Sequence, residues 1–181
     1  VHARLAKDLG GAAAELTLAG PEVTAPMPAG MDYATAAGLP LAGMTALQGL
    51  RDRGGMPLTG ATGRVMVVGA SGGVGHLAVQ IARAAGATVI GVCGARNAGL
   101  VQELGAHEVI DYAKPNAFEG MPPCDIILDC VGGDPGTWTP RLTAKGRYLS
   151  VVPGPAVFLR AWWRAAEHQR RIARVVEDRK S

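Results

Sequence analysis

The chain has 181 residues, of which 48% are hydrophobic and 18% are charged, and its formal net charge is +3. This length and composition are enough for one full domain, or for one domain and part of another, and they exclude a disordered, collagenous or disulfide-built protein. The three cysteines are an odd number with no close Cys-x-x-Cys pair, so they predict neither a disulfide framework nor a zinc knuckle and favour a reducing, cytoplasmic location.

The first part of the chain differs from the rest. Residues 1–38 are rich in Ala, Gly and Pro, and they are too few to form a domain alone. Within them, residues 14–18 have an extended pattern. Because the chain opens on Val1 without an initiating Met, we expect it to be a fragment. A second domain is expected over residues 39–181. It opens with a helix predicted from Pro40, whose side chains spaced for burial are Met44, Leu47 and Leu50.

A buried strand, a glycine turn and an apolar-faced helix follow one another in residues 65–82. Val65 to Val68 form the continuous apolar run that a strand buried on both faces needs. Ala70 occupies the first slot of a G-x-G-x-x-G pattern, and Gly72 and Gly75 occupy the other two. Without a side chain at Gly72, a pyrophosphate can approach the backbone and meet the N–H groups that open the helix. A tight turn that binds nothing is the alternative.

The rest of the chain alternates strands and helices. A left-handed glycine at Gly86 would end the first helix, and a second helix is predicted from Asn97 to Leu104, with Gly105 as its cap. The apolar stripe of this second helix is expected to be Leu100, Val101 and Leu104. Further strands are predicted at residues 88–93, 108–112, 124–131 and 146–152, with another candidate at 172–176. This alternation predicts an α/β protein with a doubly wound parallel (Rossmann) sheet of about six strands.

Two stretches raise the question of other partners. The uncharged run 65–82 contains four glycines, His76 and Gln80, so it predicts no membrane span. Residues 160–181 carry seven Lys or Arg and three acids, together with Trp162 and Trp163. Such a basic segment could contact nucleic acid, but a solvated helix face is the simpler interpretation, so we expect neither a membrane nor a nucleic-acid partner.

Three blocks of this sequence, residues 39–46, 69–75 and 104–112, resemble the medium-chain dehydrogenase/reductases, specifically the zinc-independent quinone oxidoreductases. Members of that family are longer at both ends. The resemblance implies that residues 1–38 are a remnant of the GroES-like catalytic domain and its connector, and that a dinucleotide cofactor binds to the Rossmann domain. No metal is implied, and a homodimer is a candidate assembly.

The end of the second strand indicates which cofactor is bound. An Asp or Glu about 20 residues beyond the glycine turn would bond the ribose 2′-OH of NAD, but this chain has Cys93 there. The thiol does not repel a 2′-phosphate, and Arg96 could bind one, so NADPH is predicted. Arg96 could instead be an ordinary exposed arginine. By resemblance, Tyr112 lies near the adenine or its phosphate, although it could simply cap its strand.

For the nicotinamide end, the resemblance implies contacts from Thr45, Val131, Gly132 and Val152. The alternatives are a helix-internal hydroxyl bond for Thr45 and core packing for the two valines. His76 is interpreted as structural, and Asp125 and Asp129 as residues that end or orient their strand. The predicted cofactor-binding residues are Thr45, Ser71, Gly72, Gly73, Val74, Cys93, Arg96, Tyr112, Val131, Gly132 and Val152.

The resemblance implies hydride transfer from NADPH to a small quinone or enone-type acceptor, without zinc. No catalytic residue can be named, because in the family the residues that polarise the acceptor come largely from the N-terminal catalytic domain. Two alternatives stay open. One is a zinc-dependent alcohol dehydrogenase, and the other is a protein that binds NADPH as a sensor without catalysis.

Overall fold

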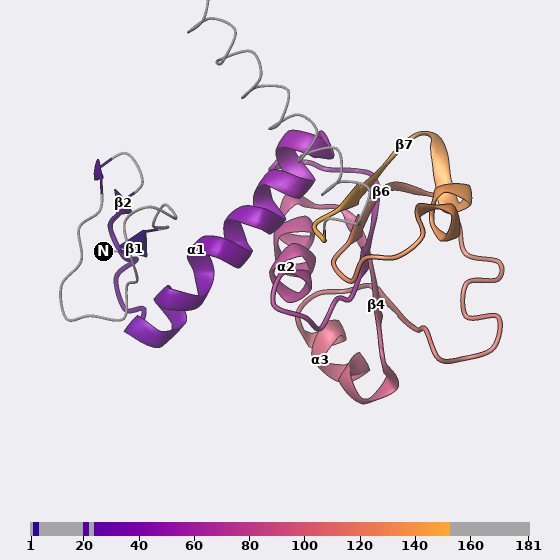
Figure 1. Cartoon of the computed structure of the whole chain (residues 1–181), viewed down its shortest axis with the longest axis horizontal. Coiled ribbons are helices and arrows are strands. Elements are labelled where there is room, and N and C mark those ends of the chain that lie inside the picture. Colours follow the sequence, from indigo (N-terminus) through magenta and orange to yellow (C-terminus); the bar gives the residue numbers. More distant parts are fainter. Residues whose placement is uncertain (1, 4–19, 22–23, 153–181) are drawn as a thin grey trace, which may run out of the picture.

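The computed structural model describes residues 2–3, 20–21 and 24–152, most of which form a parallel sheet with helices against it (Figure 1). Residues 2–3 and 24–25 form a separate antiparallel pair of strands. The α-helices are α1 (Tyr33–Gln48), α2 (Gly75–Ala85) and α3 (Ala98–Glu103). The strands are β1 (His2–Ala3), β2 (Thr24–Ala25), β3 (Arg64–Val68), β4 (Thr88–Cys93), β5 (Glu108–Asp111), β6 (Cys124–Asp129) and β7 (Leu142–Ser150). A π-helical segment occupies Gly49–Arg53, and 3-10 segments occupy Ala95–Asn97, Pro135–Thr137 and Thr139–Arg141.

The larger sheet has the strand order β5-β4-β3-β6-β7, and all its neighbouring strands are parallel. Counted from β3, this is the order 3-2-1-4-5 of a doubly wound dinucleotide-binding sheet, which confirms the predicted fold class. The order reverses between β3 and β6, where Val68 pairs with Asp129. Every strand predicted between residues 65 and 152 is confirmed, although β7 begins at Leu142 rather than Gly146.

The two faces of the sheet are covered differently. The first is packed by the three α-helices against the core residues Ala46, Leu50, Val65, Val67, Ala78, Val79, Ala82, Val89, Val101, Ile126 and Leu128. The second is packed by the connections before and after β6, around Met66, Val68, Ile90, Val92, Ile127, Phe118, Met121 and Trp138. The alternating side chains of each central strand therefore supply both cores, which explains their continuous apolar runs.

Helix α1 begins earlier than the sequence suggested. The prediction placed its start at Pro40, but Asp32 caps it by accepting a hydrogen bond from the backbone N–H of Thr35 at 2.9 Å, so Pro40 lies inside the helix. Figure 1 shows its first half beside β1 and β2, away from the large sheet, and its second half beside α2. Leu50 is fully buried as expected, whereas Met44 is 44% exposed, so the prediction of its burial is wrong.

The glycine caps are confirmed. Gly86 and Gly105 have φ values of 101° and 111° and follow the ends of α2 and α3. In α3, Val101 is fully buried, but Leu100 is 49% exposed, so its place in the apolar stripe is wrong. Neighbouring side chains on a helix point about 100° apart, and this short helix turns only Val101 squarely onto the sheet.

Some predictions fall outside the described residues: the extended stretch 14–18, the strand 172–176 and the basic segment 160–181. The division between residues 38 and 39 lies within α1 and stays a prediction. Among the described residues, no helix is both long and apolar enough to cross a membrane.

The contact between α2 and β3 depends on Gly75. A β-carbon at this position would overlap the carbonyl oxygen of Gly69 and lie 2.9 Å from the Cα of Ala70. A β-carbon at Gly73 would meet nothing within 4 Å. The close approach of α2 to the end of β3 therefore requires a residue without a side chain at position 75.

We expect Gly75→Ala to lower the free energy of unfolding by about 1–3 kcal/mol, because the added methyl group forces α2 away from the turn. Urea denaturation followed by circular dichroism measures this change. Gly73→Ala is the matched control and should stay within about 0.5 kcal/mol of the unmodified protein. Equal denaturation midpoints for the two variants would show that the close approach does not limit stability.

Candidate functional site

The glycine turn leaves β3 through a left-handed residue. Gly69 has φ +75°, and the N–H groups of Gly69 and Ala70 both donate to the carbonyl of Val92 at 3.0 Å. The N–H of Gly72 then donates back to the carbonyl of Gly69 at 2.9 Å. The left-handed conformation thus falls on Gly69, which explains why the first slot of the pattern tolerates Ala70, a fully buried residue.

The start of α2 can accept an anion. Its N-cap residue, Val74, makes no side-chain capping bond, and the first turn contains no acidic residue. Nδ1 of His76 lies 2.9 Å from the carbonyl oxygen of Gly72, so His76 is part of the turn, as its structural interpretation expects. Backbone N–H groups without a capping side chain, at the positive end of the helix dipole, favour a negatively charged group.

A pocket of about 420 Å³ opens beside this turn. It brings together four of the predicted cofactor-binding residues, Ser71, Cys93, Arg96 and Tyr112, from the turn and from the ends of β4 and β5. Its full lining is Gly69, Ser71, Cys93, Gly94, Ala95, Arg96, Asn97 and Tyr112. The size is in the range of small-molecule sites, and the pocket opens at the carboxyl ends of the strands, where open parallel sheets bind ligands.

The floor of the pocket carries no acidic side chain. Cys93 is 2% exposed, and burial, followed by the charge of Asp111, raises the pKa of its thiol. Asp111 pairs with Cys93 across the strands, but its carboxylate accepts the N–H of Ala113 at 3.1 Å and does not line the pocket. A phosphate in this pocket would therefore meet a neutral thiol at the end of β4.

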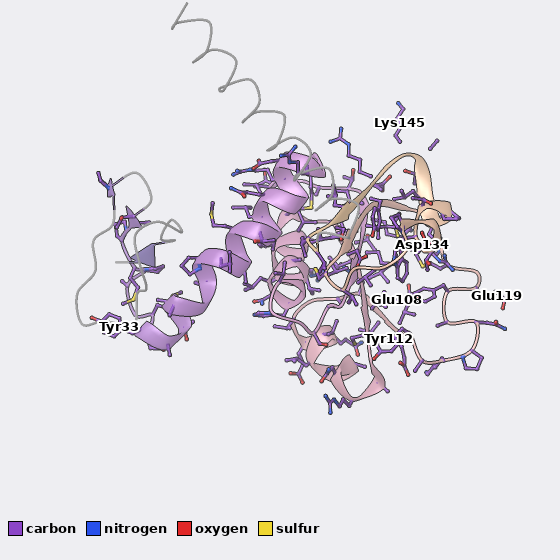
Figure 2. The ribbon with its side chains drawn as sticks, viewed as in Figure 1. Tyr33, Glu108, Tyr112, Glu119, Asp134 and Lys145 are labelled. Atoms are coloured by element: carbon purple, nitrogen blue, oxygen red, sulfur yellow. The ribbon has the colours of Figure 1, made fainter. Side chains whose placement is uncertain are left out.

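Arg96 and Tyr112 form the outer part of the pocket. Arg96 is exposed and, within the described part of the chain, has neither a hydrogen bond nor an ion pair. Tyr112 follows β5 on the surface, 64% exposed, and a β-carbon at Gly94 would lie 3.5 Å from its hydroxyl (Figure 2). Both side chains thus have their polar ends available to a ligand.

Four lining residues are absent from the predicted set: Gly69, Gly94, Ala95 and Asn97. Asn97 is the one whose side chain joins two parts of the site. Asn97 donates from Nδ2 to the hydroxyl of Ser71 at 3.1 Å, which ties the loop after β4 to the glycine turn. The available signal was its position in the same short loop as Arg96, because the loops after parallel strands converge at one edge of the sheet.

The valines and the glycine predicted for the nicotinamide end lie on the other side of Gly69. A β-carbon at Gly69 would lie 2.7 Å from Cγ2 of Val131, and one at Gly132 would lie 3.0 Å from Cγ1 of Val152. Val131 is 61% exposed and Val152 39%, so the core-packing alternative is wrong for both. Their side chains are open to a ligand at the point where the strand order reverses.

Thr45 makes its hydrogen bond within its own helix. Its hydroxyl donates to the carbonyl of Leu41 at 2.7 Å within α1, which is the helix-internal bond that the sequence left as the alternative. Its role beside the nicotinamide stays a prediction. In the part of the chain that the structure describes, no group of three or more His, Cys, Asp or Glu side chains is arranged to hold a metal ion.

Comparisons with known proteins agree with this geometry. The family described as zinc-binding dehydrogenase matches residues 73–152. The chloroplast envelope quinone oxidoreductase homolog of Arabidopsis thaliana is 41% identical over 153 residues, which cover 81% of this chain and 46% of that protein. The chain thus spans about half the length of the curated relatives it matches first.

The solved structures that this chain resembles also include quinone oxidoreductases. The quinone oxidoreductase from Coxiella burnetii has a TM-score of 0.65 and 34% identity, covering 73% of this chain and 41% of that one. The quinone oxidoreductase from Thermus thermophilus, described together with its NADPH complex, has a TM-score of 0.62 and 29% identity, covering 75% of this chain and 45% of that one.

The three thiols are expected to be unreactive in the folded protein. Burial raises the pKa of Cys124 to about 11 and that of Cys130 to about 12, from an ordinary value of 9.0, and it also raises the pKa of Cys93. At pH 8 the thiolate fraction of Cys124 and Cys130 should fall by roughly 100-fold or more relative to the unfolded chain. Alkylation by iodoacetamide, followed by mass spectrometry of each site with and without urea, measures the difference.

The same shifts have a consequence for stability. Because the folded state keeps these protons after the unfolded chain has lost them, stability should fall as the pH rises above about 9. Comparable alkylation rates for Cys130 in the folded and unfolded protein would contradict the raised pKa of its thiol.

Proposed function

Since the chain belongs to the medium-chain dehydrogenase/reductase family, in which it is similar to the quinone oxidoreductases, we propose that it forms the dinucleotide-binding part of an NADPH-dependent reductase. In this proposal, hydride passes to a quinone or enone-type carbonyl acceptor without zinc. The observation that carries it is the pocket that the glycine turn, Cys93 and Arg96 line together.

The cofactor is proposed to lie across the carboxyl edge of the sheet. Its pyrophosphate would meet the N–H groups at the start of α2, which have no side-chain cap. Its adenosine and 2′-phosphate would enter the 420 Å³ pocket, where Arg96 supplies a charge and Tyr112 a hydroxyl. Its nicotinamide would lie on the side of Gly69 where Val131, Gly132 and Val152 gather.

The preference for NADPH over NADH rests on charge. An Asp or Glu at the end of β4 would repel a 2′-phosphate, whereas the thiol of Cys93 is buried and protonated. The guanidinium of Arg96 has no acidic partner among the described residues, so it can bind a phosphate without first breaking an ion pair. Both features favour the phosphorylated cofactor.

When bound, the nicotinamide supplies the hydride chemistry. The residues described here would bind and orient the cofactor and would keep water from its buried side. The group that polarises the acceptor oxygen is expected in the catalytic domain, of which residues 1–38 are the proposed remnant. The substrate is accordingly proposed by class only, and a homodimer is the proposed assembly.

The free cysteines Cys93, Cys124 and Cys130 support a reducing compartment, and the cytoplasm is the location we propose. The Arabidopsis relative, by contrast, is named a chloroplast envelope protein.

A zinc-dependent alcohol dehydrogenase is the second candidate. It is favoured by the description of the matching family as zinc-binding dehydrogenase. The two candidates share the cofactor site, so they differ in the catalytic domain and in the requirement for metal.

We expect Arg96→Ala to weaken NADPH binding about 10- to 100-fold, because a charged hydrogen bond to the 2′-phosphate is lost. Binding of NADH, which lacks that phosphate, should change by less than about 3-fold. Titration of each cofactor by fluorescence measures both constants. Arg51→Ala is the control, since it removes the same charge from an exposed residue that pairs with Asp52. Equal losses for NADPH and NADH would remove Arg96 from the phosphate site.

The full-length protein should oxidise NADPH in the presence of quinones or enones, and its rate should survive dialysis against a chelator. Loss of NADPH absorbance with a panel of acceptors, before and after dialysis, measures this. Activity that requires stoichiometric zinc would support the alcohol dehydrogenase instead. Tight NADPH binding with no turnover of any acceptor would identify a sensor that binds the cofactor without catalysis.

A further inference from the structure

Asp129 is a buried carboxylate at the point where the strand order reverses. It is the last residue of β6, and only 1% of its surface is exposed. Its Oδ1 accepts hydrogen bonds from the N–H groups of Val131 at 2.9 Å and Gly132 at 3.0 Å. A buried charge is costly unless its oxygens are satisfied, so this carboxylate and the backbone turn that follows it stabilise one another.

The second oxygen of Asp129 is held from the neighbouring strand. The hydroxyl of Tyr148, on β7, donates to Oδ2 at 2.7 Å. Burial, followed by this hydrogen bond, raises the pKa of Tyr148 to about 12, so the hydroxyl keeps its proton and remains a donor. Tyr148 packs with the core on the second face of the sheet, which fixes the position of its ring.

The turn fixed by Asp129 carries the residues proposed for the nicotinamide end. Val131 lies against Gly69, the first residue of the glycine turn, and Gly132, with φ +80°, lies against Val152. The carbonyl of Asp129 also accepts the N–H of Val151 at 3.0 Å. A rotation of the Asp129 side chain would release both N–H groups of the turn and let the backbone at Val131 and Gly132 move.

We propose that Asp129 and Tyr148 are positioning residues for the nicotinamide end of the cofactor. Asp129 holds the backbone of Val131 and Gly132, and Tyr148 holds the rotamer of Asp129. Neither side chain is proposed to touch the reacting atoms. This inference rests on the proposed function, because it assigns the turn to the same dinucleotide site. It adds that separate sets of residues hold the adenosine end and the nicotinamide end of the cofactor.

The test uses two probes of different length on the full-length protein. NADPH occupies both ends of the site, whereas adenosine 2′,5′-bisphosphate occupies only the adenosine end. The variants are Tyr148→Phe, which removes one hydroxyl, and Asp129→Asn, which changes the charge and one acceptor. Asp125→Asn is the matched control, because Asp125 lies on the same strand and accepts hydrogen bonds from the N–H of Arg64 and the hydroxyl of Thr143 away from the pocket.

We expect Asp129→Asn to weaken NADPH at least about 10-fold and Tyr148→Phe about 3- to 10-fold, the effect of one lost hydrogen bond. Affinity for the bisphosphate should stay within about 2-fold in both, and the control should change neither probe. The fluorescence of the bound reduced nicotinamide should also shift toward that of free NADPH in these two variants, because the ring loses its fixed surroundings. A residue with only a structural role would not change that spectrum selectively.

The possible results distinguish failure of the positioning role from failure of the dinucleotide site itself. Parallel losses for NADPH and bisphosphate, or no loss for either, would overturn the positioning role while leaving the dinucleotide site intact. If the unmodified protein binds neither probe, the proposed function fails and this inference fails with it. If Asp129→Asn does not fold, Tyr148→Phe alone decides, since its only change is the loss of the hydroxyl.

Discussion

The approach of α2 to the end of β3, with backbone touching backbone, is the constraint on which the rest of the structure depends. It is possible because Gly75 has no side chain and Gly69 can adopt a left-handed conformation. The start of α2 is thereby held at the carboxyl edge of the sheet, beside the reversal of strand order. The small residues Ala78, Ala82 and Ala85 then continue the close contact along the helix. The uncapped start of α2 and the packing of the first core are consequences of the same few residues.

Charge is distributed on this edge in two different ways. The pocket beside the turn has an exposed cation, Arg96, without an acidic partner among the described residues, which leaves it available to a ligand. The carboxylate of Asp129, two strands away, is buried and satisfied by donors from its own turn and from Tyr148. These three hydrogen bonds offset the cost of burying the carboxylate and fix its position. Arg96 can therefore contact a ligand directly, whereas Asp129 holds the backbone that a ligand would contact.

The central strands and the glycine ends of the helices could be predicted from the sequence because their signals are local. A run such as Val65–Val68 buries both of its faces, and Gly86 marks a left-handed cap with no help from distant residues. The start of α1 is also marked locally, by Asp32 and Thr35, although the proline at position 40 favours a later start. The exposure of Met44 and Leu100 could not be predicted, because periodicity identifies an apolar face without showing whether anything covers it.

By itself, the sequence determined the order of strands and helices, the glycine turn, and a thiol in place of an acid at the end of β4. The tertiary structure alone decided which of the candidate residues come together. Ser71, Cys93, Arg96 and Tyr112 share one pocket although they are separated along the chain, and Asn97 joins them. It also decided that Val131 and Val152 are open to a ligand rather than part of the core. The physical reason is that parallel strands bring their carboxyl ends to one edge of the sheet, which local patterns can predict. The orientation of each side chain at that edge depends on contacts from other strands, such as the hydrogen bond from Tyr148 to Asp129.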